Sequence, residues 1–189
     1  PGTRDWALAA NVTRTTADPA PQLDFIDAAW TFSGGAIPSG GVSADYDAYS
    51  LGNASFEFWF KPASLPTATK QVLWETGGNT GASFVLDGNQ LRFVVDAQAS
   101  GAIAEGTPSR SSAQVGVGHC VGVIDLANDQ IKLYLDGALV DTKAIASVTD
   151  WAGVSGSGLG TITDSSVVET SSQSHLGGNM LLSGTHNPF

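Results

Sequence analysis

Apolar and polar residues alternate with a period of two through the middle of the chain. The clearest case is residues 55–61, where Phe56, Phe58 and Phe60 alternate with Glu57, Trp59 and Lys61. Because the side chains of an extended strand point alternately to its two faces, the three phenylalanines form one apolar stripe. Pro62 lacks a backbone N–H and is expected to end the strand. The pattern predicts a strand that packs this stripe into a core.

Shorter apolar runs predict more strands, at residues 71–75, 83–86, 91–95, 121–126, 131–135 and 138–140. Asp87-Gly88 and Asp136-Gly137 separate neighbouring runs, and Asp-Gly favours the tight turn of a β-hairpin. Ile131, Leu133 and Leu135 are expected to face the core together. No window has the period of an amphipathic helix, so we expect no α-helix beyond single turns. The fold class predicted is all-β, a two-sheet antiparallel jelly-roll sandwich.

The two ends of the chain are less regular. Residues 1–22 mix Thr, Ala and Pro, and we interpret them as a lead-in with one short strand around residues 6–12. Residues 23–189 are interpreted as one domain. Within it, the Gly/Ser-rich residues 153–160 predict a surface loop, and residues 174–178 predict a strand that ends in a turn.

Composition narrows the choice of partners. Eight basic residues face 18 acidic ones, which gives a net charge of −10. This charge disfavours nucleic acids and anionic membranes as partners. No apolar run approaches the roughly 20 residues of a membrane span. Low lysine with abundant Ser, Thr, Gly and Asp favours an extracellular or cell-surface location. Cys120 is the only cysteine, which excludes an intrachain disulfide and a cysteine-based metal site, and we expect it to be buried.

Several of these motifs together resemble a known family. Residues 55–62 form an aromatic strand followed by Lys-Pro, residues 71–78 fit the next strand, and residues 131–137 end in Leu-Tyr-Leu-Asp-Gly. In order and spacing they resemble the laminin-G-like domains of the concanavalin A-like lectin/glucanase superfamily. The resemblance covers roughly residues 23–178 and implies the jelly-roll fold. It says little about function, because one fold carries many functions.

The resemblance also predicts a missing strand. The family continues after a Gly-Gly turn, here Gly177-Gly178, into a final strand, and the chain stops at Phe189 where that strand is expected. An open slot would expose unpaired backbone groups and readily accept another strand. We therefore predict a strand donor: a second chain, a neighbouring copy, or the lead-in. The alternative is that the given sequence omits the strand.

The carboxylates argue against an enzyme. Retaining glycosidases place two carboxyl groups about 5 Å apart. None of the four glutamates has a second acid two or four residues away on its strand: Glu57, Glu75, Glu105 and Glu169. The three histidines are far apart, and no serine lies in a nucleophile elbow: His119, His175 and His186. The chain is therefore predicted not to be an enzyme.

Two kinds of binding site are candidates. Asp45 and Asp47 place two carboxylates on an expected rim loop, and oxygen ligands suit calcium, which laminin-G-like domains often bind at the rim. The alternative is that both merely solvate a turn. Trp74, Asn79 and Trp151 are candidate sugar-binding residues, because lectins stack sugar rings on exposed tryptophans beside Asp or Asn. The alternative is that these tryptophans are buried.

Together these observations predict a non-catalytic binding or adhesion module of a secreted or surface protein, which recognises a glycan or a surface protein through rim loops. One alternative is a purely structural module of a multi-domain surface protein or virion appendage. Another is a degenerate glycoside hydrolase or lyase.

Overall fold

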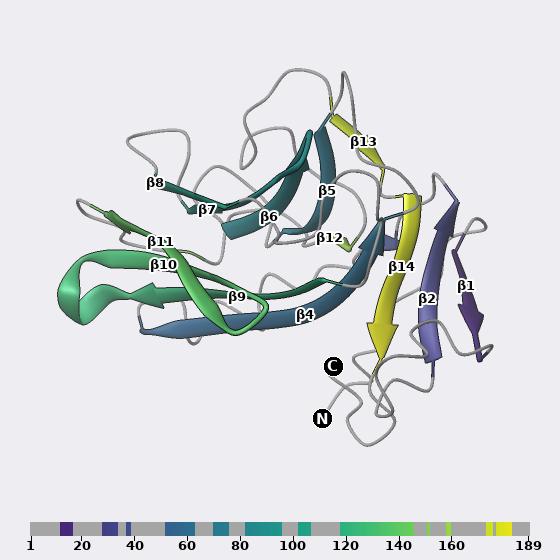
Figure 1. The fold of residues 1–189 in the computed structure, drawn as a ribbon, viewed down its shortest axis with the longest axis horizontal. Coiled ribbons are helices and arrows are strands. Elements are labelled where there is room, and N and C mark those ends of the chain that lie inside the picture. Colours follow the sequence, from purple (N-terminus) through teal and green to yellow (C-terminus); the bar gives the residue numbers. More distant parts are fainter. Residues whose placement is uncertain are drawn as a thin grey trace.

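The computed structural model describes residues 12–16, 28–33, 37–38, 52–62, 70–75, 82–95, 102–106, 118–145, 151, 158–159, 173–175 and 177–182. These residues form two β-sheets packed face to face (Figure 1). The part described contains no α-helix, only the 3-10 turn η1 (Leu126–Asn128). It also holds no helix that is long and apolar enough to cross a membrane.

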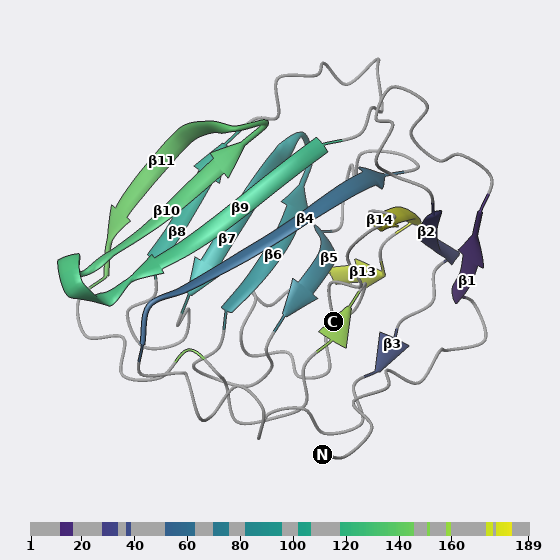
Figure 2. The same ribbon diagram turned by 90° about the horizontal axis from the view of Figure 1, so that it is seen from below.

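Sheet A has seven strands. In spatial order they are β1 (Val12–Thr15), β2 (Ala28–Ser33), β14 (Gly177–Leu182), β4 (Ala54–Pro62), β9 (Gly118–Asp125), β10 (Gln130–Leu135) and β11 (Ala138–Ala144). All its neighbouring strands pair antiparallel. Seen from below, β4, β9 and β10 lie across the strands of the second sheet (Figure 2).

Sheet B forms the other layer. Its main order is β3 (Ile37–Pro38), β12 (Gly158–Leu159), β5 (Lys70–Glu75), β6 (Ala82–Asp87), β7 (Gln90–Val95) and β8 (Ala102–Gly106). A further strand, β13 (Gln173–His175), pairs with β5 and is parallel to it. The predicted all-β, two-sheet antiparallel sandwich is therefore confirmed, with this one parallel pairing.

The core lies between the sheets and follows the predicted stripes. Phe60, Ile131, Leu133 and Leu135 are buried, as predicted. Phe56 and Phe58 are only partly buried, although both pack against the core cluster. Phe56, for example, has its ring centroid 4.4 Å from that of Trp74 and 5.2 Å from that of Trp151.

Both predicted Asp-Gly hairpins are present. Asp136 has φ 49° and Gly137 has φ 83°, so both central residues of the β10–β11 turn have positive φ, as a type I′ turn requires. In the β6–β7 turn, Gly88 alone has a positive φ, of 60°, which fits type II′. These turns fix the register of the two hairpins.

The prediction of a missing final strand is wrong. β14 lies between β2 and β4, and Gly178 pairs with Phe32 on one side and with Pro62 on the other. Gly177-Gly178 therefore begins a strand instead of ending one, and the strand continues through the apolar run to Leu182. The slot for which a strand donor was predicted is filled by this chain's own residues.

Two further segments differ from the expectations. The lead-in contributes β1 at the edge of sheet A, and β1 begins only at Val12; residues 6–11 lie outside the described residues. Gly158–Leu159, expected in a surface loop, forms the short strand β12 between β3 and β5. The division of the chain at residue 22 stays a prediction.

Candidate ligand-binding face

The face of sheet A that points away from sheet B carries a cluster of chemically active side chains. The core stripe of β4 points inward, so Glu57 and Trp59 point outward. On β9, Cys120 is buried in the core and its neighbour His119 therefore points outward. The β4–β9 register places Trp59 directly opposite His119. Alternation and register thus bring these three side chains onto one surface.

Within this cluster the contacts are close. The rings of Trp59 and His119 stack with centroids 4.3 Å apart and planes 26° apart. Glu57 Oε1 lies 2.7 Å from His119 Nε2. The Glu57 side chain is 63% exposed and the His119 side chain 16%. We call Glu57, Trp59 and His119 the Trp59 cluster: an aromatic pair with a solvent-exposed carboxylate beside it.

The β10–β11 turn holds the backbone of this cluster in place. The backbone N–H of His119 donates a hydrogen bond of 3.1 Å to Asp136 Oδ1, and the N–H of Asp136 donates one of 2.9 Å to the carbonyl of His119. The positive φ of Asp136 turns the chain back at this point. The tight turn thereby holds the backbone of His119, from which the imidazole projects.

Half-exposed apolar side chains extend from the cluster across the same face. Val121 lies opposite Glu57 on one side and Tyr134 on the other. Val121, Val123 and Tyr134 are each partly buried, and Leu139 on the edge strand β11 is 53% exposed. A solvent-facing surface of mixed aromatic, aliphatic and charged groups is typical of a recognition surface.

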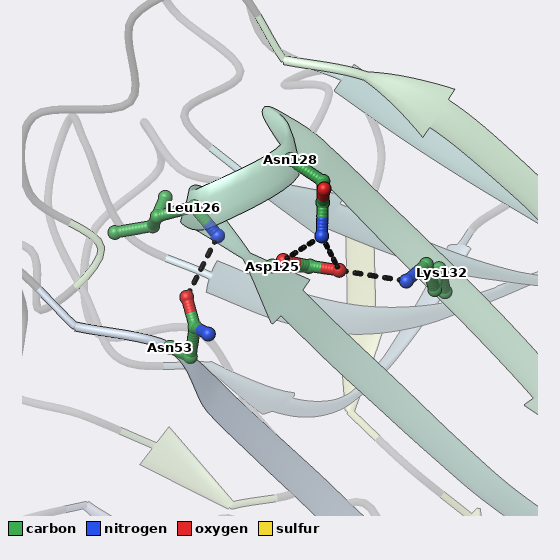
Figure 3. Close-up of polar contacts among 5 residues, drawn as sticks. All are labelled: Asn53, Asp125, Leu126, Asn128 and Lys132. Carbon is green, nitrogen blue, oxygen red and sulfur yellow. Dashed lines mark hydrogen bonds and ion pairs between the residues drawn. The ribbon is translucent and has the colours of Figure 1, made fainter.

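The tip of the β9–β10 hairpin has a different character (Figure 3). Asp125 accepts hydrogen bonds from Lys132 Nζ at 2.7 Å and from Asn128 Nδ2 at 3.0 and 2.9 Å. The backbone N–H of Leu126 donates to Asn53 Oδ1 at 2.9 Å. Hydrogen bonds from Lys132 and then Asn128 lower the pKa of the Asp125 carboxyl, and Asp125 raises the pKa of Lys132. The Asp125 carboxylate is thus already paired with the ammonium group of Lys132 within the hairpin.

The outer face of sheet B has fewer side chains that a ligand could reach. Val72, Val85 and Val94 are each 1% exposed, and Ser83 is fully buried. Arg92 Nη1 lies 3.0 Å from Asp87 Oδ2. Among the side chains of this face that the structure describes, none is an exposed aromatic ring.

Among the predicted ligand-binding residues, the two tryptophans are in the core. Trp74 is 4% exposed and Trp151 is 3% exposed. Trp151 Nε1–H donates to the carbonyl of Gly52 at 3.0 Å. A β-bulge in β5 between Val72 and Trp74 shifts the alternation, so that Leu73 and Trp74 both reach the core. The alternative of buried rings is therefore the correct one, and neither ring offers an exposed face for stacking.

The remaining predicted site residues are not brought together by what the structure describes. Asn79, Asp45 and Asp47 lie outside the described residues, and their roles stay predictions. Within the described ranges, no group of three or more His, Cys, Asp and Glu side chains is arranged to hold a metal ion. The sequence did place Trp59 and Glu57 on one strand face. That His119 lies beside them could be learned only from the β4–β9 register.

The two-sheet antiparallel sandwich agrees with the family to which the sequence matches. A laminin G family model, described as the Concanavalin A-like lectin/glucanases superfamily, matches residues 34–176. The chain therefore belongs to this superfamily. Comparison with curated proteins finds no match.

Three solved structures illustrate the similarity of fold. The CBM40 domain of the Ruminococcus gnavus IT-sialidase has a TM-score of 0.56 and 16% identity over 76% of this chain and 83% of its own. Domains LG4-5 of the mouse laminin alpha1 chain give 0.51 and 14% over 70% of this chain and 34% of theirs. The binding domain of botulinum neurotoxin DC gives 0.51 and 14% over 82% and 33%. At these identities the likeness establishes the fold.

Proposed function

We propose that this chain is a non-catalytic binding module that recognises a glycan on the outer face of sheet A. The observation that carries the proposal is the Trp59 cluster, where a stacked aromatic pair and an exposed carboxylate lie together on a rigid sheet. Aromatic rings bind the apolar C–H face of a sugar, and a carboxylate accepts hydrogen bonds from its hydroxyl groups.

The comparisons support glycan recognition as the class of function. The CBM40 domain has been solved with α2,3- and α2,6-sialyllactose bound, and the neurotoxin binding domain in complex with SialylT. The proposal retains an extracellular or cell-surface location, further contacts from rim loops, and calcium at Asp45 or Asp47. Calcium is tested by the melting temperature with calcium and with a chelator, since an ion that binds only the native state raises stability. Equal melting temperatures would remove calcium from the proposal.

The test of glycan binding is a glycan array followed by calorimetry on the strongest hit. Trp59→Ala is expected to abolish binding, and Trp59→Phe to retain part of it, because a smaller ring still stacks. Val140→Ala is the control, since Val140 is 41% exposed on the same sheet but its side chain lies toward Gly106 of sheet B, away from the cluster. Melting temperatures of all variants separate loss of binding from loss of folding. An array without any hit, or undiminished binding by Trp59→Ala, contradicts the proposal.

A protein partner is the second candidate function. The half-exposed Val121, Val123 and Tyr134 beside the cluster favour it, because a flat apolar surface with a polar rim is typical of protein interfaces. A blank glycan array together with a protein ligand lost on Tyr134→Ala would favour this candidate. A hydrolase is tested separately: oligosaccharide cleavage that Glu57→Gln abolishes would establish catalysis.

A further inference from the structure

Building on the proposed function, we infer that the Trp59 cluster selects neutral saccharides and discriminates against anionic ones, such as sialylated or uronic glycans. The inference concerns the ligand class of the same site. It differs from what the sialyllactose complexes of the CBM40 domain would suggest, and it rests on the charges around the cluster.

The first argument is the carboxylate of the cluster itself. Glu57 is 63% exposed and lies beside the aromatic pair, where a bound sugar ring would sit. A ligand carboxylate stacked on Trp59 would meet a like charge at close range, at a surface of intermediate dielectric constant. The hydroxyl groups of a neutral sugar would instead donate hydrogen bonds to Glu57.

The second argument is that the cations near the cluster are already engaged. Lys61 follows Trp59 by two residues on the same face of β4, and it takes part in an interaction of its own. His119 Nε2 is already engaged by Glu57 Oε1 at 2.7 Å, and its backbone N–H by Asp136 Oδ1. On the same sheet, Lys132 Nζ lies 2.7 Å from Asp125 and Lys143 Nζ lies 3.2 Å from Asp141. An anionic ligand would have to compete with the groups that already engage these cations.

The third argument is the electrostatic field produced by the net charge of the whole chain. A net charge of −10 slows the approach of anions and weakens their binding. Unlike the effect of Glu57, this contribution is spread over the surface and is screened by salt. The two contributions can therefore be measured separately.

The experiment is a glycan array and calorimetry with matched pairs: each neutral oligosaccharide and its α2,3-sialylated counterpart, for example lactose and α2,3-sialyllactose. We expect the sialylated member to bind at least about tenfold more weakly, which corresponds to about 1.4 kcal/mol. In about 1 M salt, where the Debye length is about 3 Å, the part of this ratio due to net charge should disappear while the local part remains.

Two variants separate the local charge from the global one. Glu57→Gln and Asp141→Asn each remove one negative charge, but only Glu57 belongs to the cluster. Glu57→Gln is expected to move the sialylated-to-neutral affinity ratio toward one, and Asp141→Asn to leave it nearly unchanged. If Glu57 had a merely structural role, Glu57→Gln would weaken the binding of both saccharides of a pair equally, and the ratio of their affinities would not change.

Three outcomes are distinguishable. Preference for neutral members with a ratio that responds to Glu57→Gln supports the inference. Equal or tighter binding of the sialylated members overturns the inference but leaves the proposed function standing. Binding of neither member of any pair overturns the proposed function, and the inference with it.

Discussion

Gly122 on β9 is the position where one methyl group should disturb the core most clearly. A Cβ built there would lie 2.6 Å from Phe84 Cζ and 2.7 Å from two ring atoms of Phe93. Both rings are fully buried and stack on each other with centroids 4.7 Å apart. Real Cβ contacts lie above 3 Å. One ring or strand β9 must therefore move in the Gly122→Ala variant.

The magnitude follows from two opposing contributions. Overpacking a close-packed core costs about 1–3 kcal/mol. Because two buried rings support each other here, we expect a cost at the upper end, about 3 kcal/mol. Replacing a strand glycine by alanine returns about 0.5–1 kcal/mol of conformational entropy. The net loss for Gly122→Ala is therefore about 2 kcal/mol, or about 4–8 °C in melting temperature for a chain of this size.

The assay is urea unfolding followed by tryptophan fluorescence, with calorimetry for the melting temperature. Gly118→Ala is the graded control, because its Cβ would lie 2.9 Å from the ring of Phe60 alone and should cost less. Adding Phe93→Leu to Gly122→Ala should cost less than the sum of the single changes, with a coupling of about 0.5–3 kcal/mol. Wild-type stability of Gly122→Ala, or simple additivity with Phe93→Leu, would refute the packing argument.

Three further predictions concern the same half of the chain. Because hydrogen bonds from Lys132 and Asn128 lower the pKa of Asp125, this carboxylate stabilises the fold above its unfolded pKa, and that contribution is lost as the pH falls through the lowered folded pKa. Asp125→Asn should therefore flatten the acid limb of the stability profile measured by urea midpoints, and an unchanged limb would contradict this. Burial raises the pKa of the Cys120 thiol, so iodoacetamide should label it only in denaturant, and rapid labelling of the native protein would count against the structure. Gly137→Ala should lose about 1–2 kcal/mol in the same urea assay because Gly137 has φ 83°, whereas an unaffected midpoint would exclude the type I′ turn.

The strands and hairpins could be predicted because their signals are local. Alternation in β4, β9 and β10 and the two Asp-Gly turns are each contained within a few residues, and the structure follows them closely. β14 escaped prediction because its first two residues are glycines, which normally interrupt a strand. Only the pairing of Gly178 with Phe32 and Pro62 identifies it as an interior strand.

The tryptophans show where local alternation fails. Counting in twos along β5 puts Leu73 and Trp74 on opposite faces, and the bulge after Val72 puts both in the core. A bulge adds one residue to one strand and has no fixed sequence signature, so the facing of every later residue in that strand becomes uncertain from sequence alone. Trp151, which lies outside the predicted strands, had no periodicity from which its burial could be inferred.

The Trp59 cluster could be predicted from sequence only in part. Alternation alone puts Glu57 and Trp59 on one face of β4, and the burial expected for Cys120 puts its neighbour His119 on the outward face of β9. What sequence could not supply is that β4 and β9 are neighbours in register, since Glu57 and His119 are 62 residues apart. A slip of one residue would turn His119 into the core and Cys120 toward Glu57, leaving a buried imidazole without its carboxylate. The Gly122 pocket excludes that slip, because moving the strand by one residue would place a side chain against Phe84 and Phe93. The close packing that favours glycine at position 122 on the inner face therefore also aligns the candidate site on the outer one.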